Sequence, residues 1–194
     1  APHRTIAELE AEVLAHCARI ASIGDELGIG HWLLGHHPFA TLADVPRMPK
    51  ARYEIMRGYL ASHGARGLEM MHLTSSVQTT VDFTNEADIV QKLRTAAKAS
   101  PFLTALTSAS PFTAGTPNGM KSLRYQIWLE TDDERCGLWP EMVDDEGLTI
   151  ARYVRRALDA PAMLFVRGGV FRKAEPKPYR VYARDGFERT TVTV

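Results

Sequence analysis

The sequence has neither a charge excess nor a long apolar run, and each absence removes a class of protein. Its 23 Lys and Arg residues balance 23 Asp and Glu residues, which gives no electrostatic reason to expect nucleic acid or an anionic membrane as partner. No apolar run approaches the roughly 18–20 residues that span a bilayer. The first residues, APHRTIAELEAEV, lack the apolar centre of a signal peptide. We therefore expect no nucleic-acid partner, no membrane partner and a cytoplasmic protein.

Cysteine is also scarce, since Cys17 and Cys136 are the two thiols in 194 residues. They lie far apart in the sequence and match no metal-ligand spacing. In a reducing compartment neither thiol needs a partner. Cys17 falls on the apolar face of a predicted helix, which favours a buried thiol. Redox control through the pair is the alternative that the sequence leaves open.

The first 30 residues have the pattern of one amphipathic helix. Thr5 and Glu8 fit a capping box, in which each side chain covers a free backbone N–H. Apolar residues follow at helical spacing as far as Leu27, and Gly28 ends the pattern. We expect a helix over residues 5–27, a short strand at 31–34 and a solvated turn at His36-His37-Pro38, where no third ligand lies nearby to complete a metal site.

The rest of the chain alternates helices with loops and short strands. Pro49 opens a second helix that reaches Leu60, since a proline at the first helical position loses no hydrogen bond. Residues 109–119 and the acidic stretch 130–146 are rich in turn-forming residues and predict loops. We expect helices at 85–106 (disturbed by Pro101) and 148–158, a helical or extended segment at 122–128, and strands at 162–166, 179–182 and 190–194.

Residues 72–82 alternate between apolar and polar side chains, the period of a strand with two different faces. Leu73, Val77 and Val81 share the apolar face. The other face has no Lys, Arg or Glu and consists of His72, Thr74, Ser76, Gln78, Thr80 and Asp82. A solvated antiparallel sheet would show the same alternation. Short polar groups that end in a carboxylate favour the lining of a ligand cavity equally well.

Four stretches together resemble the plant and proteobacterial type of glutamate–cysteine ligase. They are MPKARYEIMRGY at 48–59, LEMMHLTSSVQTTVDFTNEADIVQKLR at 68–94, SPFTAGTPNGMKSLRYQIWLETDDERCG at 110–137 and YVRRALDAPAML at 153–164. Their order and separations match the family. The resemblance divides the chain into an N-terminal helix at 1–27, a central segment of the ligase catalytic domain at 28–166 and a polar, truncated C-terminal extension at 167–194.

The resemblance implies an α+β fold, with a glutamine-synthetase-like curved antiparallel sheet and helices packed on one face, incomplete in this fragment. Its concave face would hold ATP, Mg²⁺ and glutamate. In the implied reaction the γ-carboxylate of glutamate attacks ATP, and the cysteine amine captures the acyl phosphate in the first step of glutathione biosynthesis. The alternatives are a related ligase with another amine acceptor, or a non-catalytic relative that only binds.

The same resemblance assigns candidate substrate ligands. Arg124, which follows the Ser-Pro-Phe and Pro-Asn-Gly loop, matches an arginine of the family and is the expected catalytic and substrate-binding group. Arg52 matches a second arginine that holds the glutamate carboxylate, for which the planar guanidinium fork is suited. A surface salt bridge for Arg124 and a helix-surface role for Arg52 are the structural alternatives. Thr74 and Ser76 are expected to hydrogen-bond substrate.

Gln78 and Asp82 are the expected Mg²⁺ ligands, and Thr80 is associated with the same ATP and metal region. Gln78 stands where distant ligases of this superfamily place a metal-binding histidine. Asp82 could instead cap the turn at Thr84–Asn85. Arg135 could approach phosphate, although pairing with Asp132 or Asp133 is the favoured role.

Some family features are missing. Leu73 stands where the family has an arginine, and Met163 stands near a tyrosine that shapes the cysteine pocket in plant members, so the acceptor is open. The family's glutamate-rich metal motif and its Tyr-Leu-Glu-x-Arg motif do not occur in these residues. We therefore expect this segment to be inactive alone, and its unpaired sheet edges to favour self-association.

Overall fold

A computed structural model describes residues 3–143 and 147–187. The chain divides into two units, residues 1–34 and residues 35–194. The first unit contains α1 (Ile6–Leu27). The capping box forms as predicted, because Thr5 Oγ1 accepts from the Glu8 N–H at 3.2 Å and Glu8 Oε2 accepts from the Thr5 N–H at 3.3 Å. Gly28, with φ 66°, ends the helix in the left-handed conformation that glycine adopts without strain.

Two expectations for the first unit are wrong. Cys17 is exposed rather than buried, since nothing within this unit covers that side of α1. Residues 31–34 form no strand and carry no regular secondary structure.

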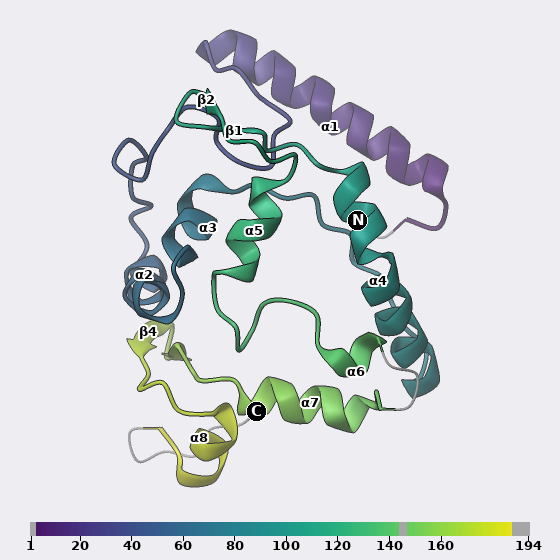
Figure 1. The fold of residues 1–194 in the computed structure, drawn as a ribbon, viewed down its shortest axis with the longest axis vertical. Coiled ribbons are helices and arrows are strands. Elements are labelled where there is room, and N and C mark those ends of the chain that lie inside the picture. Colours follow the sequence, from purple (N-terminus) through teal and green to yellow (C-terminus); the bar gives the residue numbers. More distant parts are fainter. Residues whose placement is uncertain (1–2, 144–146, 188–194) are drawn as a thin grey trace. The chain divides into compact units, whose positions relative to one another are not determined.

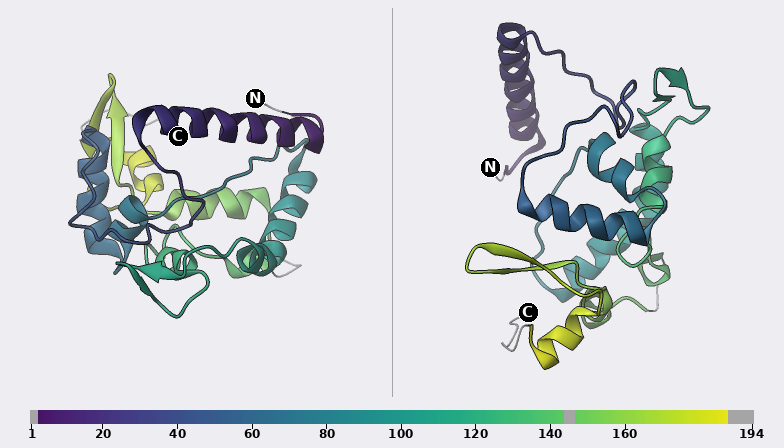
Figure 2. Two further views of the ribbon diagram at one scale, coloured as in Figure 1. Left: turned by 90° about the horizontal axis from the view of Figure 1, so that it is seen from above. Right: turned by 90° about the vertical axis from the view of Figure 1, so that its left-hand side faces the viewer.

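The second unit combines seven helices with two short antiparallel hairpins in its described residues (Figures 1 and 2). The helices are α2 (Ala51–His63), α3 (Gly67–Leu73), α4 (Glu86–Leu106), α5 (Leu123–Leu129), α6 (Pro140–Val143), α7 (Ile150–Asp159) and α8 (Tyr179–Asp185). The hairpins are β1 (Phe112–Thr113) with β2 (Thr116–Pro117), and β3 (Leu164–Arg167) with β4 (Val170–Lys173). This mixture confirms the α+β class.

Two helices of the second unit, α4 and α7, begin at local capping signals. The Asn85 side chain accepts from the Asp88 N–H at 3.0 Å to begin α4, and the Thr149 hydroxyl accepts from the Arg152 N–H at 3.2 Å to begin α7. The predicted second helix is α2, although it begins at Ala51, two residues after Pro49. Residues 122–128, left open between helix and strand, form α5.

The strand predicted at 72–82 does not form. Its start belongs to α3, which ends at Leu73, and Thr74 makes a single isolated bridge with His36. Residues 75–83 carry no regular secondary structure and are exposed, with Val77 98% accessible. Alternation alone does not make a strand. Residues 35–37 pair with the backbone of 73–75 through two hydrogen bonds and the bridge at Thr74, and this contact is too short to extend as a strand over 76–82. The curved sheet and the polar wall are therefore not present in the described residues.

The C-terminal predictions are corrected in part. The expected strand at 162–166 is β3, which begins two residues later, and its partner β4 was missed. Gly168 and Gly169, with φ 55° and 75°, supply the positive φ angles of the tight turn between them. Residues 179–182 form the start of α8 rather than a strand. The strand predicted at 190–194 lies outside the described residues.

Two groups of buried side chains hold the second unit together. Leu60 on α2, Leu73 on α3, and Leu123 and Ile127 on α5 are at most 7% exposed. A separate cluster near the C-terminus packs Phe165 and Tyr179 against Ala162, Ala174, Tyr182 and Phe187. The first group fixes α3 and α5, which carry the candidate site.

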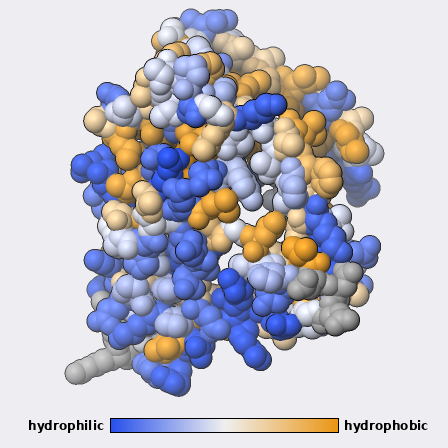
Figure 3. Space-filling view, viewed as in Figure 1, coloured by the Kyte–Doolittle hydropathy of each residue, from blue (hydrophilic) through white to orange (hydrophobic). Residues whose placement is uncertain are grey.

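The surface has many exposed apolar side chains. Figure 3 shows apolar residues in clusters between hydrophilic ones on one face. Phe102 and Leu106 of α4 are 78% and 83% exposed. Within the described part of the chain, no helix is both long and apolar enough to cross a membrane.

Candidate functional site

Arg124 lies at the start of α5 and connects two segments that are distant in the sequence. Its Nε–H donates to the carbonyl of Ser75 at 2.7 Å, and its backbone N–H donates to Ser110 Oγ at 3.0 Å. Gly35 lies against it, so a Cβ at Gly35 would be 3.1 Å from Arg124 Cδ. Burial lowers the pKa of Arg124 from its ordinary value, but a guanidinium stays charged at neutral pH. The structure therefore places this cation beside the polar segment that begins at Thr74.

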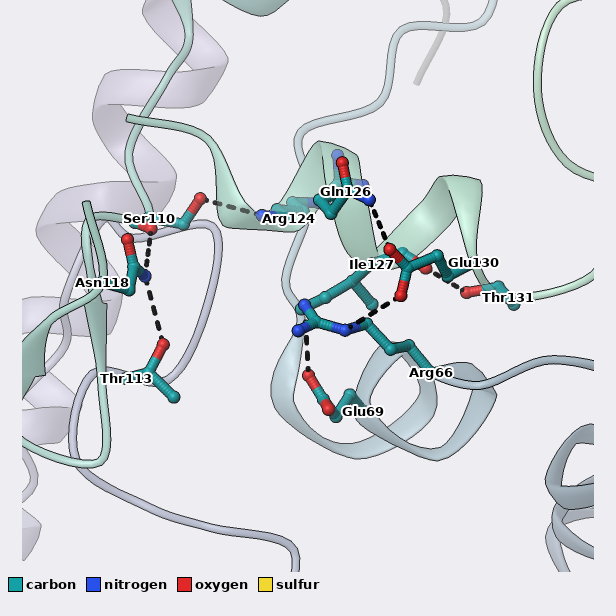
Figure 4. Close-up of polar contacts among 10 residues, drawn as sticks. All are labelled: Arg66, Glu69, Ser110, Thr113, Asn118, Arg124, Gln126, Ile127, Glu130 and Thr131. Carbon is teal, nitrogen blue, oxygen red and sulfur yellow. Dashed lines mark hydrogen bonds and ion pairs between the residues drawn. The ribbon is translucent and has the colours of Figure 1, made fainter. Parts of the chain in front are cut away.

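The loop before α5 is shaped by its own side chains (Figure 4). Asn118 Nδ2 donates to the carbonyl of Ser110 and to Thr113 Oγ1, both at 3.1 Å, and its Oδ1 accepts from the Met120 N–H at 2.9 Å. Ser110 is 2% exposed, and its N–H donates to the Lys121 carbonyl at 3.1 Å. These contacts hold Ser110 where it receives the Arg124 N–H.

An ionic network joins α3 to α5, as Figure 4 also shows. Arg66 Nε lies 3.2 Å from Glu130 Oε2, and its backbone N–H donates to the Glu130 carbonyl at 3.0 Å. Glu69 Oε2 is 3.9 Å from Arg66 Nη1, and Gln126 Nε2 donates to Glu130 Oε1. Because the pairs are partly exposed, their value lies in fixing geometry more than in stability. They fix the helix that presents Arg124.

The remaining predicted site residues are exposed or only partly buried. Thr74 Oγ1 donates to the Met70 carbonyl at 2.7 Å, and Gln78 Nε2 donates to Ser76 Oγ at 2.9 Å. Thr80 and Asp82 are exposed, and the Asp82 carbonyl accepts from Lys92 Nζ at 2.6 Å. The structure thus brings Arg124 next to Ser75, between Thr74 and Ser76.

Arg52 is not drawn into this group. It is exposed on α2, where its Nη2 donates to the hydroxyl of the adjacent Tyr53 at 3.3 Å and its guanidinium lies 4.9 Å from the Tyr53 ring centre. Asp82 does not cap the turn at Thr84 either. Asp88 accepts from the Thr84 N–H at 2.8 Å instead.

Arg135 has the role that the sequence favoured. Its Nη1 lies 2.6 Å from Asp132 Oδ2, and the same nitrogen donates to the Tyr59 hydroxyl at 2.8 Å. Burial opposes the charge of Arg135, but the hydrogen bonds to Tyr59 and Asp132 outweigh it and raise its pKa. Arg135 is therefore a structural ion-pair partner.

Comparison with known proteins places this arrangement in a family. The model of glutamate-cysteine ligase family 2 (GCS2) matches residues 1–189. The chain belongs to glutamate-cysteine ligase family 2. The chloroplastic glutamate–cysteine ligase B of Oryza sativa subsp. japonica is 45% identical over 166 residues, which cover 86% of this chain and 33% of that protein. The chloroplastic enzyme of Brassica juncea is 41% identical over 171 residues, 88% of this chain and 33% of that protein.

The chloroplastic glutamate–cysteine ligase of Arabidopsis thaliana is a further relative, 42% identical over 161 residues. The chain thus spans about a third of the length of the curated relatives it matches. These relatives are named chloroplastic, which contradicts the expectation of a cytoplasmic protein. The charge balance and hydropathy of this segment carry no information about targeting by other parts of a protein.

The family resemblance implies Mg²⁺, and the residues can be tested against it. No group of three or more His, Cys, Asp or Glu residues within 3–143 and 147–187 could hold a metal ion. Gln78 and Asp82 belong to the exposed segment and offer one amide oxygen and one carboxylate, so most of the six octahedral positions of Mg²⁺ would have to be filled by other ligands. The described residues do not form a complete metal site.

Sequence reasoning missed one polar group of the second unit. His36, expected in a solvated turn, is 2% exposed and lines a cavity of about 660 Å³ between α3 and the loop before α5. No local signal distinguishes it from the neighbouring His37. His36 forms an isolated backbone bridge with Thr74, and the N–H of the adjacent His37 donates to the Leu73 carbonyl at 2.8 Å, so the burial of His36 depends on residues that are distant in the sequence.

Proposed function

We propose that the protein to which this chain belongs is a glutamate–cysteine ligase, and that this segment contributes part of its substrate site. The observation that carries the proposal is the 41–45% identity to proteins named glutamate–cysteine ligase over more than four fifths of the chain. The geometry around Arg124 supports it, because that cation is held beside the segment with the predicted substrate-binding hydroxyls.

The proposed reaction joins the γ-carboxylate of glutamate to the amine of cysteine. A carboxylate oxygen attacks the γ-phosphorus of ATP, the bond to ADP breaks, and a γ-glutamyl phosphate forms. The cysteine amine then attacks the acyl carbon, loses a proton and expels inorganic phosphate. Positioning and charge neutralisation supply most of the catalysis in phosphoryl transfer. The protein groups required are therefore cations and hydrogen-bond donors at fixed positions.

Arg124 is suited to hold a carboxylate or the transferring phosphoryl group. The bond from its Nε to Ser75 fixes the plane of the guanidinium. Its two Nη groups make no hydrogen bond within the described residues, so they can form two parallel bonds to an anion. Thr74 and Ser76 flank this position and would hydrogen-bond the same substrate.

Arg52 would supply the second carboxylate contact. Its guanidinium is held by Tyr53 alone, so a change of rotamer could carry it to substrate. Gln78, Thr80 and Asp82 are proposed to contact ATP and to give part of the Mg²⁺ coordination set. These three residues lie on one exposed segment and make no ion pair within the described residues.

We further propose that residues 72–82 join a glutamine-synthetase-like curved sheet in the whole protein, with 28–166 as the central part of the catalytic domain. The exposed apolar face of this segment, with Val77 98% and Val81 65% accessible, supports a role as a strand that needs partners. In this segment alone, the same exposure would favour self-association.

The test is ATP hydrolysis by the full-length protein and by the 194-residue segment, with glutamate and with or without cysteine. We expect turnover that needs both glutamate and cysteine in the full-length protein, its loss in Arg124→Ala, and none in the segment. Turnover with glutamate that ignores cysteine but accepts another amine would correct the acceptor. A full-length protein without glutamate-dependent turnover would overturn the proposal.

A further inference from the structure

The cavity at His36 has polar groups that the proposed ligase site does not use. It is open to solvent on one side and has a volume of about 660 Å³, within the range of small-molecule sites. Its lining includes His36, Arg66, Glu69, Leu73, Asn118 and Met120. It contains none of the residues assigned above to glutamate, ATP or Mg²⁺. All of its lining belongs to the second unit of the chain.

His36 is the feature that calls for a ligand. It is 2% exposed, yet neither Nδ1 nor Nε2 has a hydrogen-bond partner of acceptable geometry. A buried polar group without a partner costs about 1–3 kcal/mol, so such a group in a native protein needs an explanation. Burial lowers the pKa of His36, against the smaller opposing effect of the Glu69 carboxylate. The neutral ring offers one donor and one acceptor.

Arg66 and Glu69 place opposite charges at the same cavity. Arg66 Nη1 is buried without a hydrogen bond, since the nearest Glu69 oxygen is 3.9 Å away. Asn118, by contrast, already makes three hydrogen bonds and shapes the wall. In Figure 4 Arg66 and Glu69 lie together on α3, apart from the group of Asn118, Thr113 and Ser110.

This charge pattern selects among ligand classes. A simple anion would meet Glu69 in the cavity and Glu130 behind Arg66, at 3.2 Å from its Nε. A simple cation would meet Arg66. A metal would find His36 and Glu69 alone, and no cluster of three ligands exists among the described residues. A zwitterion satisfies both charges, and an apolar group on it would contact Leu42, Leu73 and Met120.

We propose that this cavity binds a free α-amino acid with an apolar side chain. Its carboxylate accepts from Arg66 Nη1 and from the His36 ring, and its ammonium group faces Glu69. The side chain occupies the apolar part of the cavity. This second site is separate from the substrate groups around Arg124 and goes beyond the proposed ligase activity.

Equilibrium binding to the full-length protein tests the proposal without any turnover. L-methionine is the probe, titrated by calorimetry near neutral pH, with methionine methyl ester and 4-(methylthio)butanoic acid as analogues that lack one charge each. We expect saturable binding of methionine and affinities at least about ten-fold weaker for both analogues, because each leaves one charged group unpaired.

Variants locate the site. Glu69→Gln and His36→Phe should each weaken methionine binding by at least about ten-fold. Glu54→Gln, which removes an exposed carboxylate of α2 outside the lining, should leave it unchanged. Thermal unfolding shows whether each variant is folded. If His36→Phe does not fold, the methionine affinity of Glu69→Gln alone tests the location of the site.

Three results would overturn the proposal. The first is the absence of saturable methionine binding at millimolar concentrations. The second is an equal affinity for methionine in Glu69→Gln and in the wild type. The third is loss of methionine binding in Arg124→Ala together with full competition by glutamate. The last result would make the cavity part of the substrate site. Each is independent of whether the protein turns over ATP.

Discussion

The guanidinium of Arg135 donates to the hydroxyl of Tyr59 over 2.8 Å, although 76 positions separate the two residues in the chain. The same Nη1 lies 2.6 Å from Asp132 Oδ2, and the guanidinium carbon is 5.0 Å from the Tyr59 ring centre. Asp132 is 3% exposed. One arginine thus joins α2 to the loop after α5, close to the network that fixes α5.

Loss of either partner of Arg135, Asp132 or Tyr59, should destabilise the second unit. Asp132→Ala leaves the Arg135 charge with only a hydroxyl partner in a largely buried place. We expect a decrease of about 3 kcal/mol in the free energy of unfolding, measured by urea denaturation. Tyr59→Phe removes a single hydrogen bond and should cost about 1 kcal/mol.

An exposed pair provides the matched control for Asp132. Asp185 is paired with Arg184 on α8, and both side chains are more than half exposed. Asp185→Ala should leave the unfolding midpoint unchanged within error, since exposed ion pairs contribute little. Equal losses in the two variants would mean that burial does not set the strength of the Arg135 contact.

Two glycines near α2 should respond to alanine in opposite directions. A Cβ on Gly64 would collide with the carbonyl oxygen of Thr131 and lie 2.5 Å from that of Glu130. Since both are backbone atoms, we expect Gly64→Ala to reduce stability by about 2 kcal/mol. Gly58, inside α2, has nothing within 4 Å of such a Cβ. Gly58→Ala should stabilise by about 0.5–1 kcal/mol.

Denaturant unfolding of the two variants in parallel measures this difference. The opposite signs have two causes, which are the space around the added Cβ and the helical backbone at Gly58. A stabilised Gly64→Ala would show that the loop at Thr131 does not pack against the end of α2.

Local signals predicted the longer helices α1, α2, α4 and α7 because the causes of those helices are local. The capping box of Thr5 and Glu8 was predicted, whereas the caps at Asn85 and Thr149 were found in the structure. The short helices α3, α6 and α8 were missed. The strand predictions failed where the deciding partner is distant or absent. Residues 72–82 alternate, but the described structure gives this stretch one isolated bridge, at Thr74, and no ladder of paired residues.

The candidate site was predictable only in part for the same reason. The family resemblance selected Arg124, but no sequence pattern indicated that Ser75, 49 residues earlier, accepts its Nε–H. His36 and His37 are adjacent in the sequence. The contact that separates them is a hydrogen bond from His37 N–H to Leu73 O, formed by long-range packing.

His36 should make stability depend on pH. Burial lowers its pKa in the folded protein below the ordinary value of 6.5. Above about pH 6.5 the ring is neutral in both states. As the pH falls, the unfolded chain takes up the proton first, so stability decreases until the pH passes below the folded pKa. The slope from one group is at most about 1.4 kcal/mol per pH unit.

Urea unfolding at about pH 7.5 and about pH 5.5 measures this effect. The decrease should be smaller in His36→Phe than in wild type. Some dependence should persist, because burial also lowers the pKa of His72. Identical decreases in wild type and variant would contradict a buried neutral His36.

Arg124 and Arg52 can be separated by their structural roles. Arg124→Ala removes the Nε–H that donates to the Ser75 carbonyl. The Ser75 N–H itself donates to Gly35 O at 3.2 Å, and the neighbouring His37 N–H donates to Leu73 O at 2.8 Å. We expect amide hydrogen exchange at Ser75 and His37 to become about 2–10-fold faster, as loss of one hydrogen bond allows. Arg52→Ala should leave both amides unchanged, because the hydrogen bond and ring contact that Arg52 makes in the described structure are with its neighbour Tyr53 on α2, a different helix from that of Arg124.

Glutamate-dependent turnover of the full-length protein provides a second comparison of Arg124 with Arg52. Both alanine variants of the full-length protein should lose glutamate-dependent turnover if both arginines bind substrate. Arg124→Lys should keep the charge but lose the planar fork, so its loss of turnover should approach that of Arg124→Ala. Unchanged exchange at Ser75 and His37 in Arg124→Ala would show that the arginine does not hold the segment in place. An unchanged KM for glutamate in Arg52→Ala would return Arg52 to the helix surface.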